Sequence, residues 1–279
     1  MPSRLEYYYQ GQKMKVIQET CIAGRTIDRT IKITSGNHRS KRSPKINITP
    51  EKVQKNNDRI AAKKLMRLLN ANFAGGDLHI VLTYKDAPDQ MQAKKDRENF
   101  LKALRRKLKK NGKDLKYIAV TEYKHTRIHH HIVIGDCDIA LIEETWKKGF
   151  VKYSVLDNTG NYADLAAYLI KETTKTIREE GSVQKKRYSR SANLITPIVT
   201  KRYVDESKLW EDPEPIKGYY IDQDHCRRYE HPVTGLEHLE YIMVAIDEPR
   251  KIKRWPGRKI GGSEYYKTTY EEEQESLWI

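Results

Sequence analysis

The alternation of apolar and polar positions predicts strands and amphipathic helices from the start of the chain. Residues 14–34 contain two β-rich stretches, Lys15–Thr20 and Arg29–Ile33, on either side of Ala23-Gly24, a pattern typical of a β-hairpin. In residues 50–73, apolar side chains recur near helical spacing, which predicts a helix.

A regular series of elements follows between residues 78 and 178. The pattern predicts, in order, strand 78–84, helix 88–110, strands 115–123 and 128–134, helix 139–148, strand 150–156 and helix 162–177. The first six have the order of the split βαβ motif of ferredoxin-like folds, and the last helix is an addition. We therefore predict an α+β fold in which a ferredoxin-like antiparallel sheet has helices on one face and leaves the other face free for a site.

Composition divides the chain into three parts. Residues 1–75 are a basic N-terminal extension of hairpin, loop and helix, which we expect to pack on a core at residues 76–200. Residues 201–279 are a C-terminal region whose role the sequence does not indicate. Two prolines in Trp210–Pro215 suggest a linker there, and Leu239–Ile246 has the pattern of a strand.

The chain is strongly basic before residue 200. Its 279 residues include 53 Lys and Arg against 38 Asp and Glu, a formal net charge of +15. Residues 1–75 carry +11, residues 76–200 carry +8 and residues 201–279 carry −4. This excess favours an acidic partner, with nucleic acid the leading candidate. The alternative is that the basic residues only keep the protein soluble.

The sequence also bears on location. No window approaches the ~18 consecutive apolar residues of a membrane-spanning helix, and Met1–Gln10 lacks the apolar core of a signal peptide. The three cysteines are far apart, which argues against a disulfide scaffold and for a reducing compartment. We therefore expect a soluble, cytoplasmic protein without membrane contact.

One further set of residues, in the C-terminal region, contains the side-chain types that bind zinc. The spacing of His225, Cys226, His231 and His238 matches no common zinc-site pattern.

The tract His129-His130-His131 is the strongest candidate for metal binding. Because side chains alternate faces along a strand, His129 and His131 point to one side and His130 to the other. Glu122 ends the preceding strand, and a short antiparallel turn would bring it close to the pair. Two imidazoles and a carboxylate with open coordination positions are typical of a catalytic metal site. The alternative is a half-exposed strand end without a metal.

The last predicted helix carries a candidate nucleophile. Tyr168 and Lys171 are about 60° apart on a helical wheel, so both can face one site. A phenol is a poor nucleophile near neutral pH because its pKa is about 10, but a nearby metal or cation favours the phenolate. Lys171 can neutralise charge that develops on a phosphate. Tyr162 faces elsewhere, and the alternative for Tyr168 is simple packing beside Leu165 and Leu169.

In combination, these residues resemble the HUH endonucleases. The strand LHIVLTY, Glu122 with His129-His130-His131, and Tyr168 with Lys171 follow the three-motif order of that superfamily. Over roughly residues 14–200, the chain is most similar to the rolling-circle replication initiators (Rep proteins) of bacterial plasmids and phages, including the filamentous-phage gene II kind. The segment Lys185–Ser191 also looks like the basic tail that follows the tyrosine helix in such proteins.

The resemblance implies a mechanism. His129 and His131 would be ligands of Mg²⁺ or Mn²⁺, Glu122 a third ligand, Tyr168 the nucleophile, and Lys171 an assisting residue. The protein would nick single-stranded DNA at a replication origin, link Tyr168 to the 5′-phosphate and leave a 3′-hydroxyl to prime synthesis. It would act in the cytoplasm of a bacterial cell, encoded by a plasmid or phage.

Three features of the sequence bear on how closely it follows this family. The middle HUH position is usually a bulky apolar residue, so the polar His130 could replace a neighbour as a ligand. A single catalytic tyrosine needs a second protomer or a second nucleophile to finish a replication round, which is consistent with a homo-oligomer. No Gly-x-x-x-x-Gly-Lys-[Ser/Thr] loop is present, so a host or plasmid helicase would act in trans.

Basic loops are the candidate DNA contacts outside the site. The candidates are Arg39, Lys41, Arg42 and Lys45 in the first loop, and Lys185, Lys186, Arg187 and Arg190 in the second, with Tyr188 available to stack on an unpaired base. A solvated role is the alternative for each cation.

Three other functions compete with initiation. The same chemistry serves mobilisation or transposition in relaxases and tyrosine transposases. A non-catalytic single-stranded nucleic-acid-binding protein and a metal-dependent hydrolase that uses water are alternatives of other classes.

Overall fold

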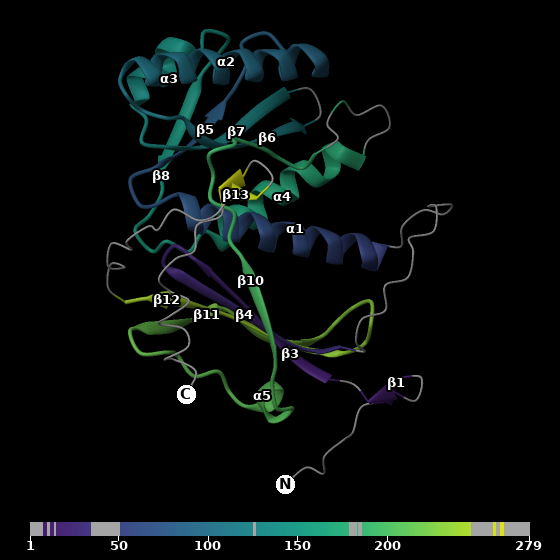
Figure 1. Ribbon diagram of the computed structural model, residues 1–279. Coiled ribbons are helices and arrows are strands. Elements are labelled where there is room, and N and C mark those ends of the chain that lie inside the picture. Colours follow the sequence, from purple (N-terminus) through teal and green to yellow (C-terminus); the bar gives the residue numbers. More distant parts are fainter. Residues whose placement is uncertain are drawn as a thin grey trace.

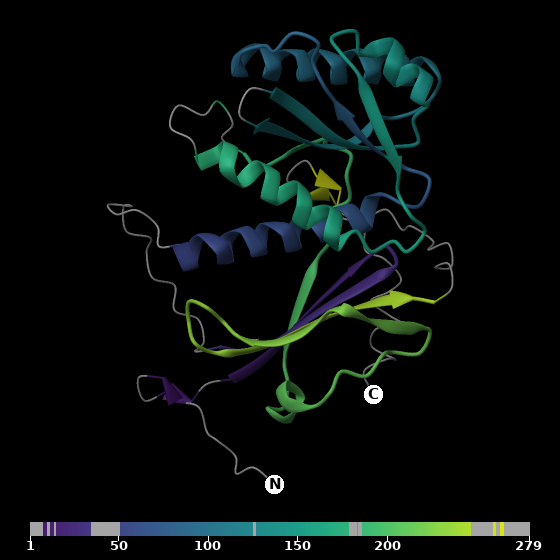
Figure 2. The same cartoon turned by 180° about the vertical axis from the view of Figure 1, so that it is seen from behind.

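The computed structural model describes residues 8–9, 12–13, 15–34, 51–124, 127–178, 183, 186–246, 259–260 and 263–264. The fold is α+β and is built in stacked layers (Figure 1): a pair of helices, a five-stranded antiparallel sheet, two further helices, and a second five-stranded antiparallel sheet. Seen from behind, the same order of layers is visible (Figure 2). No helix within these ranges is long and apolar enough to cross a membrane.

The first sheet has the strand order β8-β5-β7-β6-β9, and all its neighbouring strands are antiparallel. Its members are β5 (Leu78–Leu82), β6 (Lys116–Lys124), β7 (Arg127–Gly135), β8 (Val151–Val155) and β9 (Ser189–Arg190). Helices α2 (Gln90–Lys110) and α3 (Ile139–Thr145) cover one face. Strand residues such as Ile80 and Ile132 pack there against Leu104 and Ile142, so alternation along each strand has created one apolar face for these helices.

The second face of this sheet is also covered, which corrects the expectation of a free face. Helix α4 (Ala163–Arg178) lies on it and runs beside α1 (Glu51–Asn72). Val120 and Val133 of the sheet form one buried cluster with Leu69 of α1 and Leu169 of α4. The added helix therefore closes most of the face on which a site is expected.

The second sheet has the strand order β10-β3-β4-β12-β11. Its members are β3 (Lys15–Ala23), β4 (Thr26–Thr34), β10 (Val199–Tyr203), β11 (Tyr219–Glu230) and β12 (Glu237–Ala245). The predicted N-terminal hairpin is confirmed as β3 and β4. Both β11 and β12 come from the region after residue 200, so the N-terminal extension and the C-terminal region share this sheet.

Short elements complete the described chain. Helix α5 (Ser207–Trp210) contacts β4 and β12. Two small hairpins pair β1 (Tyr8–Tyr9) with β2 (Gln12–Lys13), and β13 (Lys259–Ile260) with β14 (Ser263–Glu264).

Gly24 is required at the turn between β3 and β4. Its φ is +57°, in the left-handed region that side chains disfavour. A Cβ atom there would also lie 1.9 Å from the backbone oxygen of Asn70, near the end of α1. The hairpin turn and the helix can therefore approach each other only because this residue has no side chain.

Buried ion pairs join α1 to the second sheet. Asp28 of β4 accepts from Arg67 at 2.6 Å and from Lys63 at 3.2 Å. Glu240 of β12 lies 3.2 Å from Lys63 and 3.0 Å from Arg227. Because a buried carboxylate is stable only when its charge is compensated, these contacts determine how the helix sits on the sheet.

The environment of Glu240 makes the stability of the protein depend on pH. Burial alone would raise the pKa of this carboxyl, but the cations Lys63, Arg59 and Arg227 lower it to about 2. A carboxyl whose pKa is lower in the folded than in the unfolded chain stabilises the fold above its ordinary pKa of 4.5. This contribution is lost as the pH falls toward about 2.

Glu240→Gln should therefore lower the free energy of unfolding at neutral pH by about 2–3 kcal/mol. The difference from wild type should shrink as the pH falls from about 4.5 toward about 2, because wild type loses the same interaction there. Urea unfolding at a series of pH values measures this. Glu143→Gln, at an exposed position on α3, is the control. An unchanged gap between wild type and Glu240→Gln down to the lowest pH would contradict the assignment.

Candidate active site

The register of β6 and β7 places the three predicted metal ligands on one face of the sheet. Glu122 is opposite His129, and Val120 is opposite His131. Because paired residues share a face and side chains alternate along each strand, the side chains of Glu122, His129 and His131 all project toward the α4 side. The strand pairing that sequence spacing predicts for these residues is confirmed.

Glu122 and His131 are in direct contact. His131 Nε2 lies 3.2 Å from Glu122 Oε2, and the two residues are only 4% and 7% exposed. Burial, and to a smaller extent the nearby His129, lower the pKa of His131 to about 4. The imidazole is therefore neutral at neutral pH, which is the form that binds metal ions.

The imidazole nitrogens and carboxylate oxygens of these three residues are atoms that bind divalent ions, but in this structure they do not surround one common point. Two imidazoles and a carboxylate from adjacent strands share one face. Within the described ranges, no three His, Cys, Asp or Glu side chains are close enough together to hold a metal ion. His129 is half-buried and lies on the same face as Glu122 and His131.

Tyr168 reaches this site from α4. The centroid of its ring is 5.4 Å from that of His131, with the two planes at 80°. The side chain is 42% exposed, so it borders both the buried site and solvent. Burial raises the pKa of Tyr168, and the carboxylates of Glu172 and Glu122 raise it further. The phenol is thus protonated at neutral pH, and a positive charge beside Glu122 would oppose these effects.

The structure adds two residues that sequence reasoning missed. His79 of β5 has its ring centroid 5.5 Å from that of His131 and 6.5 Å from that of Tyr168. Glu172, one turn after Tyr168 on α4, acts electrostatically on both Tyr168 and His131. A signal for His79 is present in the sequence, as the only polar residue inside an apolar strand, but only the pairing of β5 with β7 links it to the site.

His130 belongs to a different environment. It is fully buried on the opposite face, where Nε2 lies 2.8 Å from the hydroxyl of Tyr84 and Nδ1 lies 2.9 Å from the hydroxyl of Thr121. Burial and the charge of Arg97 lower its pKa to about 3. Both ring nitrogens thus have partners under α2 and α3, which separates His130 from the candidate metal ligands.

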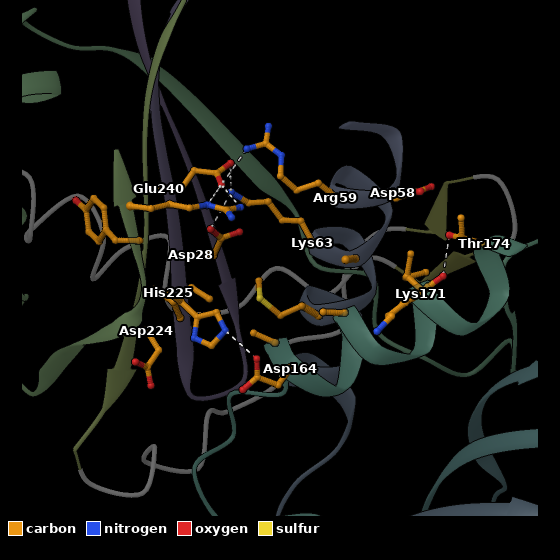
Figure 3. A pocket seen from close by; sticks show the side chains of 18 residues that line it. Asp28, Asp58, Arg59, Lys63, Asp164, Lys171, Thr174, Asp224, His225 and Glu240 are labelled. Atoms are coloured by element: carbon orange, nitrogen blue, oxygen red, sulfur yellow. Dashed lines mark hydrogen bonds and ion pairs between the residues drawn. The ribbon is translucent and has the colours of Figure 1, made fainter. Parts of the chain in front are cut away.

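Lys171 lies on another side of α4 from the site. It lines a cavity of about 640 Å³ between α4, α1, β11 and β12. Figure 3 shows Lys171 at this cavity together with Lys63 and Glu240. Tyr168 is not among the lining residues. The angular separation on the helical wheel is therefore enough to direct the two side chains into different surroundings.

Tyr162 does not compete with Tyr168 as a nucleophile. It is buried in the cluster between α1 and α4, and its hydroxyl donates to the backbone oxygen of Asp157 at 3.1 Å. The expectation that it faces elsewhere is confirmed.

The candidate DNA contacts divide into those that the structure describes and those that it does not. Five lie outside the described residues: Arg39, Lys41, Arg42, Lys45 and Lys185. Lys186 and Arg190 are exposed. Arg187 forms an ion pair with Asp58 of α1, and Tyr188 packs half-buried against the cluster between the sheets. Of the second loop, Lys186 and Arg190 thus present the most accessible charge among the described residues.

The C-terminal histidines make local contacts. His225 lies 2.9 Å from Asp222 and 3.5 Å from Asp164, and the rings of His231 and His238 stack at 4.8 Å. In the part of the chain that is described, they form no cluster of ligands for a metal ion.

Comparison with known proteins points to replication. Residues 77–193 match the model of a family described as replication-associated protein ORF2/G2P. This segment contains the strands β5 to β9 and the helix with Tyr168, hence every residue of the candidate site. No curated protein and no solved structure matches the chain. The segment that builds the site is thus similar to replication-associated proteins of this family.

Proposed function

We propose that the protein is an HUH endonuclease that nicks single-stranded DNA at a replication origin through a covalent bond to Tyr168. The observation that carries this proposal is the position of the Tyr168 ring, 5.4 Å from the ring of His131, which itself contacts Glu122. The order β8-β5-β7-β6, in which β7 separates β5 from β6, supports a ferredoxin-like core. The match to replication-associated proteins supports an origin as the target.

In the proposed reaction, one phosphodiester bond of the DNA is exchanged for a phosphodiester bond to Tyr168. The Tyr168 oxygen attacks the phosphorus atom, the bond between phosphorus and the 3′ oxygen breaks, and the downstream strand becomes joined to Tyr168 through its 5′-phosphate. The phenol loses its proton to solvent, and the released 3′ oxygen takes one up to become a hydroxyl. Because bond energy is kept in the phosphotyrosine, a later hydroxyl can reverse the step and religate the strand.

Glu122, His129 and His131 would hold the metal ion. A bound Mg²⁺ or Mn²⁺ would polarise a phosphoryl oxygen and favour the phenolate form of Tyr168. The chain itself supplies a neutral imidazole at His131 and a carboxylate at Glu122, both shielded from water.

Cations around the site would guide the DNA backbone. Lys152 of the edge strand β8 is exposed and pairs with Val81, which places it on the same face as His131. Lys171 is also exposed but lies on another side of α4, so its proposed role is to neutralise phosphate charge where the bound strand passes beyond the site. One nucleophilic tyrosine performs one transfer, so completion of a replication round would require a second copy of the chain, with a helicase from the host or plasmid to unwind the duplex.

Tyr168→Phe should abolish the covalent adduct. The test incubates the full chain with Mn²⁺ and labelled single-stranded DNA that spans its origin, and separates products under denaturing conditions. Wild type should give a denaturation-resistant adduct, whereas Tyr168→Phe should reduce it by at least about 10³-fold, because no other oxygen replaces the phenol. Tyr153→Phe, at an exposed tyrosine on β8, should retain the adduct. An adduct that survives in Tyr168→Phe would refute the nucleophile assignment.

Removal of the metal or of a ligand should stop the same cleavage. A chelator should abolish it and added Mn²⁺ should restore it. His131→Ala should lower the rate about 100-fold or more, an effect comparable to the loss of one strong contact to the transition state. His225→Ala, in β11, serves as the control because it lies outside the first sheet. Cleavage that persists unchanged in His131→Ala would count against the metal site.

A further inference from the structure

We propose that His79 is a positioning residue for His131, which it holds with Nε2 directed at Glu122. This inference rests on the proposed function, because it assigns His79 to the same metal site. It gives a role to a histidine that the motifs of the sequence do not include.

The contact between the two histidines is specific. His79 Nε2 lies 3.3 Å from His131 Nδ1, and their ring planes are 16° from parallel. The pairing of β5 with β7 sets this contact, because His131 is opposite Val81 and His79 is opposite Val133 on the same face. The two imidazoles are therefore diagonal neighbours across a strand pair.

His79 is itself held on its other side. Its Nδ1 lies 3.4 Å from the hydroxyl of Ser154 on β8, and that hydroxyl is 3.5 Å from the backbone oxygen of His79. A continuous series of hydrogen bonds thus runs across four strands, from Ser154 of β8 through His79 of β5 and His131 of β7 to Glu122 of β6. An imidazole with a partner at each ring nitrogen cannot rotate without breaking one of them.

The donors and acceptors balance in the arrangement that metal binding requires. A ligand at Nε2 needs the lone pair of that atom, so the proton of His131 must be on Nδ1, where it is donated to His79 Nε2. His79 then carries its proton on Nδ1 and donates it to Ser154 Oγ, whose own proton goes to the backbone oxygen of His79. Every proton in the series has an acceptor.

The hydrogen-bond donors and acceptors also balance when no metal ion is bound to His131. His131 then donates from Nε2 to the carboxylate of Glu122 and accepts at Nδ1 from His79. Ser154 donates to His79 Nδ1. Because the heavy atoms need not move between the two arrangements, His79 keeps the orientation of His131 constant while the protons are redistributed.

The geometry also distinguishes positioning from direct ligation. His79 reaches the Nδ1 side of His131, whereas Glu122 occupies the Nε2 side. A histidine ligand whose second nitrogen is hydrogen-bonded in this way has a defined tautomer and ring orientation. Loss of such a partner typically weakens metal binding by about 10–100-fold.

A matched pair of variants separates the hydrogen bond from the packing of the ring. His79→Phe retains an aromatic ring without a hydrogen-bonding group, and His79→Gln retains an amide that can pair with His131 Nδ1. Mn²⁺ affinity is measured on the full chain without DNA, from the loss of the free Mn²⁺ signal in electron paramagnetic resonance. His79→Phe should bind about 10–100-fold more weakly than wild type, and His79→Gln should recover most of this loss. Thermal unfolding checks that both variants fold.

The hydrogen bond at His131 Nδ1 provides a second readout that does not depend on metal binding. In the metal-free protein the proton of the His131 ring is on Nε2, where Glu122 accepts it, so nitrogen-15 NMR should show Nδ1 as a hydrogen-bonded acceptor in wild type and in His79→Gln, and as an acceptor without this hydrogen bond in His79→Phe. Ser154→Ala, which removes only the distal hydroxyl, should give a smaller change of the same kind.

Three results would decide against the proposal or against its foundation. Equal Mn²⁺ affinity and an unchanged His131 Nδ1 resonance in His79→Phe would overturn the positioning role. Equal losses in His79→Phe and His79→Gln would also overturn it, because the amide would not have rescued the contact. A wild-type chain that shows a hydrogen-bonded His131 Nδ1 but binds no Mn²⁺ would refute the metal site of the proposed function and leave the positioning contact intact.

Discussion

The packing of α4 between the two sheets is the constraint on which the site depends. One buried cluster includes Val133 of the first sheet, Leu69 of α1, Leu169 of α4 and Ile242 of the second sheet. Because this cluster fixes how α4 sits between the sheets, it also sets the directions in which the other side chains of the helix point. Tyr168 is directed at His131, while Lys171 is directed at the cavity beside α1.

The second sheet contributes to the site without supplying a residue to it. Its face toward α1 carries Asp28 and Glu240, which the cations of α1 compensate. These pairs hold α1 in register on the sheet, and α1 in turn supports α4. A site of few residues in the first sheet is therefore stabilised by strands from both ends of the described chain.

Burial has opposite effects on the groups of the site. It lowers the pKa of His131 and His79 to about 4, so both imidazoles are neutral and available as ligand and partner. It raises the pKa of Tyr168, which disfavours the reactive form of the phenol. The same desolvation thus prepares the imidazoles for a cation and leaves the tyrosine dependent on one. This difference is the physical reason why a metal and a tyrosine would act together here.

Local pattern determined most of the elements and the principal candidates. Period-two alternation placed His129 and His131 on one face, because side chains alternate in any strand, and the expected short turn brought Glu122 close to them. Helical spacing predicted α1, α2 and α4 and separated Tyr162 from Tyr168. Only the tertiary structure decided which strands far apart in the sequence are neighbours, and hence that His79 meets His131 and that strands before residue 35 and after residue 218 share a sheet. It also covered the sheet face expected to be free and turned Lys171 away from Tyr168. These features depend on long-range packing. A periodic pattern of apolar residues shows which face of a helix or strand is buried, but it does not show which other element covers that face.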